Sequence, residues 1–368
     1  MPSSSQLLNP SSSQRFSGVF SGRNVFVTGH TGFKGAWLCE WLLALGAEVT
    51  GFSLPDLPTE PSLFDGLDLA SRVRDLRGDV RDFSALLGAT QKARPDFVFH
   101  LAAQPLVLES YREPLETLQT NVLGTANLLE ALRAWDSPCA AVMVTTDKCY
   151  DNREWVHAYR ENDPLGGRDP YSASKACAEI VTSAWRQSFF EGHPVRVASA
   201  RAGNVIGGGD WAANRIVPDA MRALARGAKI PIRNPRSHRP WQHVLEPLHG
   251  YLSLAAALST SKDPALQSAF NFGPEPAASR TVEELVREIV RHWPGAWEAA
   301  EIPAAPHEAR NLQLTIEKAR QLLGWNPHWD FATTIEKTVQ WYRQSDAGKI
   351  DAAELTRADI AAFCAQAR

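Results

Sequence analysis

The stretch NVFVTGHTGFKGAW, residues 24–37, decides the fold. It opens with a short β-branched run, passes through Gly29, Gly32 and Gly35, and leads into apolar residues at helical spacing that end at Gly46. Glycines at such a junction allow a tight turn and let the backbone approach a pyrophosphate, which the amino end of the following helix binds. The stretch therefore predicts a strand–loop–helix unit that binds a dinucleotide.

Strand and helix patterns alternate through the first half of the chain. The strands are expected at 48–52, 96–102, 140–146 and 195–201, and the helices at 82–93, 114–135 and 170–190. Continuous apolar strands with helices between them are typical of a parallel sheet covered on both faces. We expect an α/β fold with a Rossmann-like doubly wound parallel sheet in residues 23–203, and a helix that is interrupted or tightly packed at Gly124.

The two ends of the chain differ from this regular part. Residues 1–22 are Ser-rich and predict a disordered tail. From residue 204 turn-rich pieces alternate with helical patterns, which predicts a smaller, mostly helical C-terminal lobe over residues 204–368, packed on the carboxyl edge of the sheet with some return of chain to the first domain. Its helices are expected near 214–228, 244–258, 281–293, 316–324 and 331–344.

Composition excludes several classes of protein. The net charge of −3 and the lack of a long basic block argue against nucleic acid or an anionic membrane surface as a partner. No apolar run approaches the ~20 residues that span a bilayer, and the N-terminus lacks the pattern of a signal peptide. Five cysteines without a CxxC pair fit reduced thiols, so we expect a cytoplasmic protein with no metal site.

The glycine loop contains one unusual residue, His30. Small side chains ease the approach of the backbone to pyrophosphate, so an imidazole here could crowd the cofactor and weaken its binding. Alternatively, the ring points away into solvent. Both possibilities remain open from the sequence.

The second strand bears on the choice of cofactor. Its tail, GFSLPD, has neither an acid at its end for a ribose 2′-hydroxyl nor an arginine for a 2′-phosphate, which favours NAD over NADP. Asp79 follows a further expected strand, where a carboxylate could meet the adenine amino group. An acidic residue in a surface turn would look the same.

The strand at 140–146 runs into Thr146, Asp147 and Lys148. One explanation is a solvated strand end in which Lys148 pairs with a carboxylate such as Asp151. The other is that the strand delivers a hydroxyl, an acid and a base to a substrate. The second explanation requires the strand end to twist, because successive side chains of a strand face opposite ways.

Tyr171 and Lys175 in YSASK stand at i and i+4, so on a helix they share one face. An ammonium at Lys175 would lower the pKa of Tyr171 and stabilise a phenolate, which can accept a hydroxyl proton. An exposed helical pair is the alternative. The motif follows VTTDK closely, which predicts that both reach the sheet edge where α/β folds bind ligands.

These motifs together resemble a known superfamily. The glycine motif, YSASK, HLAAQ (100–104), TNVLGT (120–125) and RAGNVIGGG (201–209) resemble the extended short-chain dehydrogenase/reductases. Within it, TTDKCYDNREW, DPYSASK, GNVIGGGDW and RPWQHVLEPL resemble the CDP-glucose 4,6-dehydratase family, over roughly residues 24–345. The triplet Thr146-Asp147-Lys148 resembles the CDP-sugar branch, since the dTDP-glucose enzymes carry Thr-Asp-Glu there.

The resemblance implies a redox-neutral dehydration of the nucleotide sugar CDP-glucose with NAD, in the synthesis of deoxysugars for polysaccharide. It implies that Tyr171, Lys175 and Thr146 act at C4, Asp147 as the acid at C6 and Lys148 as the base at C5. As an acid Asp147 must carry a proton, and as a base Lys148 must be neutral.

The resemblance also implies binding residues and an assembly. The cofactor-binding residues would be Gly29, His30, Gly32, Phe33, Gly35, Asp79, Val80, Leu101, Ala102, Tyr171 and Lys175. The substrate-binding residues would be Gln104, Asn204, Arg215, Arg233, Arg239, Asn271 and Arg310. Of the candidates, Arg233, His243, His307 and Arg310 are the weaker ones, since each could equally be an ordinary surface residue. The helices at 114–135 and 170–190 would form the four-helix interface of a homodimer.

Three other functions remain compatible with the sequence. Another nucleotide-sugar 4,6-dehydratase would use the same residues. A 4-epimerase would use NAD and the Tyr/Lys pair but needs no acid and base after the strand. A non-catalytic NAD-binding protein would have no need of Tyr171 or Lys175, and both are present.

Overall fold

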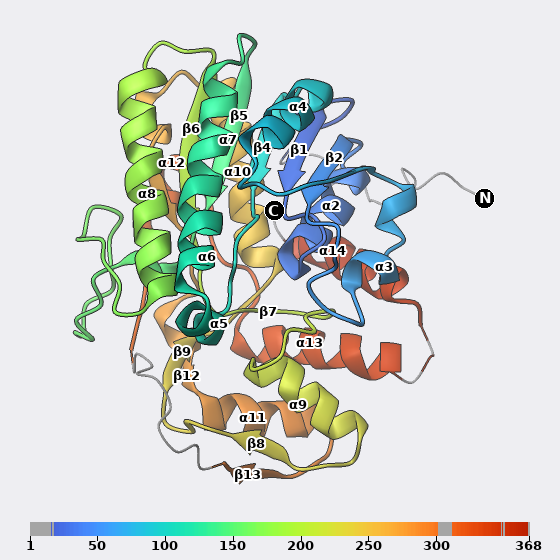
Figure 1. Ribbon diagram of the computed structural model, residues 1–368. Helices are drawn as coiled ribbons and strands as arrows, with labels where there is room; N and C mark the ends of the chain where they lie inside the picture. The colour runs from blue at the N-terminus through green and yellow to red at the C-terminus, as the bar shows by residue number, and fades with distance from the viewer. Residues whose placement is uncertain (1–15, 17, 301–310, 347, 349, 367–368) are drawn as a thin grey trace.

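A seven-stranded parallel sheet forms the centre of the molecule (Figure 1). The computed structural model describes residues 16, 18–300, 311–346, 348 and 350–366. The strand order is β11-β6-β5-β4-β1-β2-β3. The strands are β1 (Asn24–Thr28), β2 (Glu48–Ser53), β3 (Arg74–Arg77), β4 (Phe97–His100), β5 (Cys139–Val144), β6 (Val195–Arg201) and β11 (Ala269–Asn271). This order confirms the Rossmann-like fold and creates a crevice where the winding reverses, between the carboxyl ends of β1 and β4.

Helices cover both faces of the sheet (Figure 1). One layer is α4 (Phe83–Ala93), α7 (Gly124–Arg133) and α8 (Pro170–Phe189), and the other is α2 (Phe33–Ala44), α10 (Leu245–Thr260), α12 (Glu317–Leu323) and α14 (Ala352–Gln366). Val25 and Val27 of β1 belong to the core on one face, whereas Phe26 belongs to the core on the other. Each strand needs apolar residues on both sides, which explains the uninterrupted apolar runs in the sequence.

The long helix expected at 114–135 is interrupted. It consists of α6 (Pro114–Leu118), a π-helical turn η3 (Gln119–Leu123) and α7. Gly124 begins α7, and a Cβ added there would lie 2.7 Å from a methyl carbon of Val80. Gly124 is therefore both the point of interruption and a close contact with the loop after β3, as predicted.

The rest of the C-terminal half lies largely beyond the carboxyl ends of the main strands (Figure 1). Its helices are α9 (Ile216–Ala225), α11 (Val282–His292) and α13 (Phe331–Asp346). Three small sheets join β7 (Val205–Ile206) to β10 (Gln242–His243), β8 (Ile230–Ile232) to β13 (Trp297–Ala299), and β9 (His238–Pro240) to β12 (Ser279–Thr281). The short elements are α3 (Leu63–Gly66), η2 (Leu69–Ser71), α5 (Val107–Arg112), η4 (Asp147–Cys149), η5 (Pro264–Leu266) and η6 (Pro276–Ala278).

The chain returns to the first domain more than once. The helix α10 and the strand β11 complete the sheet and its layer, and α14, which the sequence did not predict, docks on α2. Arg357 of α14 donates a hydrogen bond to the buried carboxylate of Glu40 over 2.7 Å. Residue 204 is therefore not a clean boundary between two structural domains. That residues 204–368 form the substrate-binding lobe remains a prediction.

The prediction of a disordered tail is wrong at its inner end. Phe16 and Phe20 are buried, and the ring centroid of Phe20 lies 4.7 Å from that of Phe97. Residues 18–22 therefore pack on the sheet, whereas residues 1–15 lie outside the described part. Within the described residues, no helix has the length and apolar character that a membrane crossing requires.

Candidate active site

A cavity of about 1030 Å³ opens at the carboxyl edge of the sheet, against the C-terminal half. It brings together most residues that the sequence predicted. All five candidate catalytic residues line it: Thr146, Asp147, Lys148, Tyr171 and Lys175. The candidate cofactor and substrate residues that also line it are Gly29, Gly32, Phe33, Gly35, Asp79, Val80, Leu101, Ala102, Asn204, Arg215, Arg233 and Arg239.

The glycine loop leaves room and donors for a diphosphate. Gly29 has φ +74°, and a Cβ there would lie 2.6 Å from the backbone nitrogen of Ala102. A Cβ on Gly35 would lie 2.1 Å from the carbonyl oxygen of Gly29. The helix α2 starts after Gly32 without a side-chain cap, so its first N–H groups point at the cavity edge. These features suit the pyrophosphate of a dinucleotide.

His30 lies neither in the cavity nor in solvent, so both expectations for its ring are wrong. The ring is fully buried beneath the loop and does not line the cavity. Its Nε2 lies 2.9 Å from Oδ1 of Asp75 and its Nδ1 lies 2.9 Å from Oγ of Ser53. It occupies the space beside Gly51, where a Cβ would lie 2.2 Å from the ring. Burial lowers the pKa of His30, although Asp75 opposes the shift.

The end of the cavity beside β2 and β3 is lined by Asp79, Val80, Ser53 and Leu54. Asp79 forms an ion pair with Arg81 at 2.6 Å. Although burial acts in the opposite direction, hydrogen bonds from Arg81 hold the pKa of Asp79 below its ordinary value. The acidic group at this end of the cavity is therefore ionised at neutral pH.

The strand end after β5 departs from strand geometry, as the proposed chemistry requires. The strand ends at Val144, and Thr146 keeps an extended backbone with φ −149° and ψ 161°. The departure comes directly after it, where η4 begins at Asp147. Thr146 Oγ1 accepts a hydrogen bond from the backbone N–H of Lys148 over 3.4 Å. This turn brings Thr146, Asp147 and Lys148 to the same cavity. Asp151 pairs with Arg153 at 3.0 Å, so it is not held by Lys148.

The carboxylate of Asp147 is held on both sides. Thr146 Oγ1 donates a hydrogen bond to Oδ1 over 2.9 Å, and Asn204 Nδ2 donates to Oδ2 over 3.1 Å. A Cβ on Gly203 would lie 2.0 Å from this carboxylate, so only glycine fits beneath it. Asn204 adopts φ +52°, a backbone conformation that asparagine tolerates better than most residues. The backbone at 203–204 thus fixes the orientation of Asp147.

The two residues of the YSASK motif are buried at the start of α8. Burial raises the pKa of Tyr171 to about 12, against the opposing effect of a hydrogen bond with Thr146 and of the Arg215 charge. Burial lowers the pKa of Lys175 to about 8. The expected depression of the Tyr171 pKa by Lys175 is therefore absent from the protein alone, because loss of solvation outweighs every nearby positive charge.

The candidate substrate residues divide into two groups. Arg215 pairs with the buried Asp210 at 2.9 Å, and Arg233 donates to Oδ1 of Asn214 over 2.7 Å. Together with Arg239, they give the wall formed by the C-terminal half a positive character. Guanidinium groups of this kind suit the oxygens of a diphosphate.

The second group does not reach the cavity, and these predictions are wrong. Gln104 donates from Nε2 to Thr117 Oγ1 over 2.8 Å and accepts from the N–H of Leu106, so its amide serves the local backbone. Asn271 is fully buried and accepts a hydrogen bond from the Tyr150 hydroxyl over 2.7 Å.

The weaker candidates give no support either. Burial lowers the pKa of His243 to about 3, and the ring packs in the core. Arg310 and His307 lie outside the described residues.

Lys34 also lies at the site, although the sequence did not predict it. This lysine in the first turn of α2 lines the cavity, and its Nζ lies 5.9 Å from the centre of the Tyr251 ring. Burial, followed by the charges of Arg215 and Lys175, lowers the pKa of Lys34 to about 7. A charged residue between two glycines of the loop was the signal that could have identified it.

Comparison with known proteins assigns the family. The model of the GDP-mannose 4,6 dehydratase family matches residues 26–338. The CDP-glucose 4,6-dehydratase of Salmonella typhimurium is 49% identical over 331 residues, which cover 88% of this chain and 91% of that protein. The chain belongs to the GDP-mannose 4,6-dehydratase family, within the extended short-chain dehydrogenase/reductase superfamily.

Solved structures agree with the fold of this dehydratase family. The dTDP-glucose 4,6-dehydratase of Streptomyces venezuelae, with NAD bound, superposes with a TM-score of 0.77 at 23% identity, over 88% of this chain and 98% of that one. The UDP-glucose 4-epimerase of Thermus thermophilus in complex with NAD superposes with a TM-score of 0.74 at 26% identity, over 87% and 98%. These three relatives are named for CDP-, dTDP- and UDP-glucose.

Proposed function

We propose that the protein is a lyase that converts CDP-glucose to CDP-4-dehydro-6-deoxyglucose with NAD and without net oxidation, in the cytoplasm and for deoxysugar synthesis. The observation that carries the proposal is the meeting of Thr146, Asp147 and Lys148 with Tyr171 in one cavity beside the glycine loop. A 4-epimerase needs the tyrosine but not the acid and base. The relative that is 49% identical carries the same activity in its name.

NAD fits the cavity by three features. The glycines leave space for the pyrophosphate, and the uncapped start of α2 offers N–H donors. The chain after β2 carries no arginine of its own for a 2′-phosphate, and the nearby Arg77 and Arg81 are paired with Asp75 and Asp79. Bound NAD supplies a hydride acceptor at C4 of the sugar and a hydride donor at C6 of the same sugar. The polypeptide supplies the proton transfers around those two events.

Tyr171 removes the proton of the C4 hydroxyl as the hydride leaves C4. The hydroxyl of Thr146 is close enough to Tyr171 to lower its pKa, so it can also hold the C4 oxygen. The pKa of Tyr171 stays high in the protein alone, although Lys175 already lies one turn further along α8, so the phenolate requires additional positive charge. The positive nicotinamide ring of bound NAD would add that charge to the charge of the Lys175 ammonium.

The resulting C4 ketone acidifies the proton at C5. Lys148, as a neutral amine, takes that proton, and Asp147, as a carboxylic acid, gives its proton to the departing C6 hydroxyl, which leaves as water. The hydride then adds to C6, and a proton from solvent adds to C5. Lys148 ends as an ammonium, Tyr171 as a phenol and Asp147 as a carboxylate, so solvent accepts a proton from each of the first two and gives one to Asp147.

The positive wall of the C-terminal half binds the diphosphate in this proposal. Arg215 lies nearest the catalytic end, since its charge affects the pKa values of both Tyr171 and Lys34. Arg239 and Arg233 extend the wall away from the sugar, and Asn204 orients Asp147.

We also propose a homodimer. Large apolar side chains are exposed on the helices expected at the interface: Leu115 is 73% exposed, and Leu123 and Ile180 are each 55% exposed. They belong to α6, η3 and α8. Sedimentation of the purified protein should give twice the mass of one chain.

The activity is tested by incubating the purified protein with NAD and CDP-glucose, and in parallel with dTDP-, UDP- and GDP-glucose. We expect a 4-keto-6-deoxy product from CDP-glucose without accumulation of reduced cofactor. Preference for another nucleotide would assign a different 4,6-dehydratase, and formation of a CDP-hexose epimer would assign an epimerase.

A further inference from the structure

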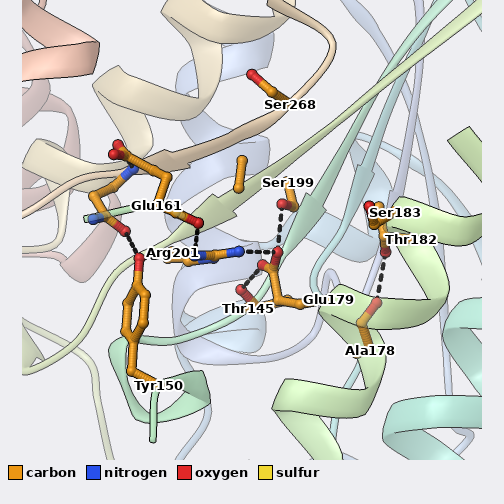
Figure 2. Close-up of polar contacts among 12 residues, drawn as sticks. Thr145, Tyr150, Glu161, Ala178, Glu179, Thr182, Ser183, Ser199, Arg201 and Ser268 are labelled. Carbon is orange, nitrogen blue, oxygen red and sulfur yellow. Dashed lines mark hydrogen bonds and ion pairs between the residues drawn. The ribbon is translucent and has the colours of Figure 1, made fainter. Parts of the chain in front are cut away.

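Glu179 and Arg201 form a buried ion pair near the proposed catalytic residues (Figure 2). Glu179 follows Lys175 by one turn of α8, and Arg201 ends β6. Arg201 Nη2 lies 2.8 Å from Glu179 Oε2, and the two side chains are 4% and 2% exposed. Neither residue lines the cavity. A buried ion pair costs desolvation free energy and is often no more stabilising than an apolar pair. We therefore consider which parts of the chain this ion pair holds in place.

The carboxylate of Glu179 holds the chain just before the acid–base triplet. Thr145 Oγ1 donates a hydrogen bond to Oε1 over 2.5 Å, and Ser199 Oγ donates to Oε2 over 2.8 Å (Figure 2). Thr145 is the residue immediately before Thr146. Both oxygens of the carboxylate are therefore in use, and one of them fixes the point where β5 turns into η4.

The guanidinium of Arg201 holds the chain just after the same triplet. Its Nη1 donates to the hydroxyl of Tyr150 over 2.8 Å and to the carbonyl of Glu161 over 3.0 Å (Figure 2). The Tyr150 hydroxyl in turn donates to Asn271 Oδ1 over 2.7 Å. The four residues 146–149 are thus bracketed by Thr145 and Tyr150, and each bracket is held by one member of a single ion pair.

We propose that Glu179 and Arg201 form a positioning pair, which holds Thr146, Asp147 and Lys148 in register with Tyr171 and Lys175. Neither residue touches the reacting atoms. The pair acts because Glu179 lies on the helix that carries the Tyr/Lys pair, while Thr145 lies between β5 and η4, directly before the triplet. Arg201 lies on the neighbouring strand β6. This inference rests on the dehydratase activity proposed above and adds to it the means by which two separate groups of catalytic residues are aligned.

The same carboxylate acts on Lys175 through its charge. Burial lowers the pKa of Lys175 to about 8, and the charge of Glu179 opposes that shift. The other titratable groups that interact with Lys175 are Cys149 of η4, Lys34 of α2 and His100 of β4, and burial keeps His100 neutral with a pKa of about 3. Glu179 is therefore the main charge that keeps the ammonium form of Lys175 at neutral pH.

Two variants separate the geometric role from the charge. Thr145→Val removes one donor at nearly constant volume, and we expect kcat to fall about 10- to 100-fold with KM within about twofold of wild type. Thr145→Ser keeps the hydroxyl and should restore the wild-type kcat. Glu179→Gln keeps an acceptor for Thr145 but loses the charge, so the alkaline limb of the pH–rate profile should move to lower pH, whereas Thr145→Val should leave that limb in place.

The matched control is Glu40→Gln. Glu40 is also a buried carboxylate that holds two arginines, Arg72 and Arg357, but it lies on α2 away from the triplet. This variant should lose stability and keep both kcat and the alkaline limb. The positioning role is overturned if Thr145→Val retains the wild-type kcat, and the effect of the Glu179 charge on Lys175 is overturned if Glu179→Gln leaves the limb in place.

A second readout does not depend on the substrate. Lys175 is proposed to contact NAD, so the affinity for NAD should decrease as the pH rises and Lys175 loses its proton. Calorimetry across pH should show that this decrease begins at a lower pH in Glu179→Gln than in wild type. An unchanged pH dependence of NAD binding would contradict the inference. A wild-type protein that binds NAD but does not convert CDP-glucose would instead refute the proposed function. If Glu179→Gln does not fold, comparison of kcat in Thr145→Val and Thr145→Ser still tests the positioning role.

Discussion

Asn204 donates a hydrogen bond from Nδ2 to Oδ2 of Asp147 over 3.1 Å, while Oδ1 of the same carboxylate accepts from Thr146. Both oxygens of the proposed acid are therefore oriented before any substrate arrives. Lys148, two residues beyond Thr146, lines the same cavity without an ion pair to Asp151. The proposed acid and the proposed base are thus different residues, so protonation of the C6 hydroxyl and removal of the C5 proton can be measured separately.

Substitution of each residue should stop the reaction at a different point. Asp147→Asn should block loss of the C6 hydroxyl but keep exchange of the C5 proton with solvent deuterium, because Lys148 is intact. Lys148→Met should lose both exchange and dehydration. Each should lower the overall rate by the ~100- to 10,000-fold typical of a lost acid or base. Mass spectrometry of recovered substrate in D₂O measures exchange, and near wild-type turnover by Lys148→Met would contradict the assignment of the base.

Tyr171→Phe keeps the packing of the ring and removes only the hydroxyl. Oxidation at C4 should fall by ~100- to 10,000-fold, and NAD affinity should stay close to that of wild type. Stopped-flow absorbance of the reduced cofactor in a single turnover measures this step. An unchanged rate would mean that the position of Tyr171 in the cavity is unrelated to the chemistry.

The activity should decline as the pH rises through about 8. Burial favours the neutral amine of Lys175 and lowers its pKa to about 8, so the proton is lost at a lower pH than from a lysine in water. The proposed role needs the ammonium, which is present below that pKa, so kcat/KM should be high at neutral pH and fall on the alkaline side. The pH profile of kcat/KM measures this, and a constant value through pH 8 would exclude the ammonium from the rate-determining step. Lys34, with a pKa of about 7, is the other lysine whose loss of a proton could cause the decline in activity. If Lys175 is responsible, Lys34→Met should leave the alkaline limb of the pH profile near 8.

His30→Gly should weaken the protein and should not tighten NAD binding. The ring is buried between Ser53 and Asp75, so its removal leaves a cavity beside Gly51. Ser53 and Asp75 also lose their hydrogen bonds to the ring. We expect a loss of about 2–4 kcal/mol in the free energy of unfolding, with equal or weaker NAD affinity. Denaturant melts and calorimetry measure the two effects. Asp75→Asn keeps an acceptor for the ring and should cost less, and tighter NAD binding by a stable His30→Gly protein would show that the ring does obstruct the cofactor.

The sequence predicted those parts of the fold and site that depend on short-range spacing. The glycine loop, the i, i+4 pair Tyr171 and Lys175, and the turn after β5 each follow from a few consecutive residues and from the rule that parallel strands present their carboxyl ends together. The close packing at Gly124 was also visible, because glycine in a long helix needs a reason.

The parts that the sequence did not predict depend on distant partners. Gln104 and Asn271 were assigned to the substrate, but Thr117 and Tyr150 take up their amides instead. The fate of a polar side chain is decided by which partner the fold brings near, and composition does not record that. Phe20 was placed in a disordered tail because its neighbours are polar, although its ring packs against Phe97.

The central claim is that one cofactor takes a hydride from C4 and returns it to C6 of the same sugar, and isotope transfer tests it most directly. CDP-glucose labelled with deuterium at C4 and with carbon-13 throughout the same glucose should be mixed with unlabelled CDP-glucose, incubated with the protein and NAD, and the product examined by NMR and mass spectrometry. The account predicts that deuterium from C4 appears at C6 of the same molecule, with one solvent hydrogen at C5 and no scrambling between labelled and unlabelled sugars. Deuterium that stays at C4 of an epimer, or that accumulates in released reduced cofactor, would contradict it.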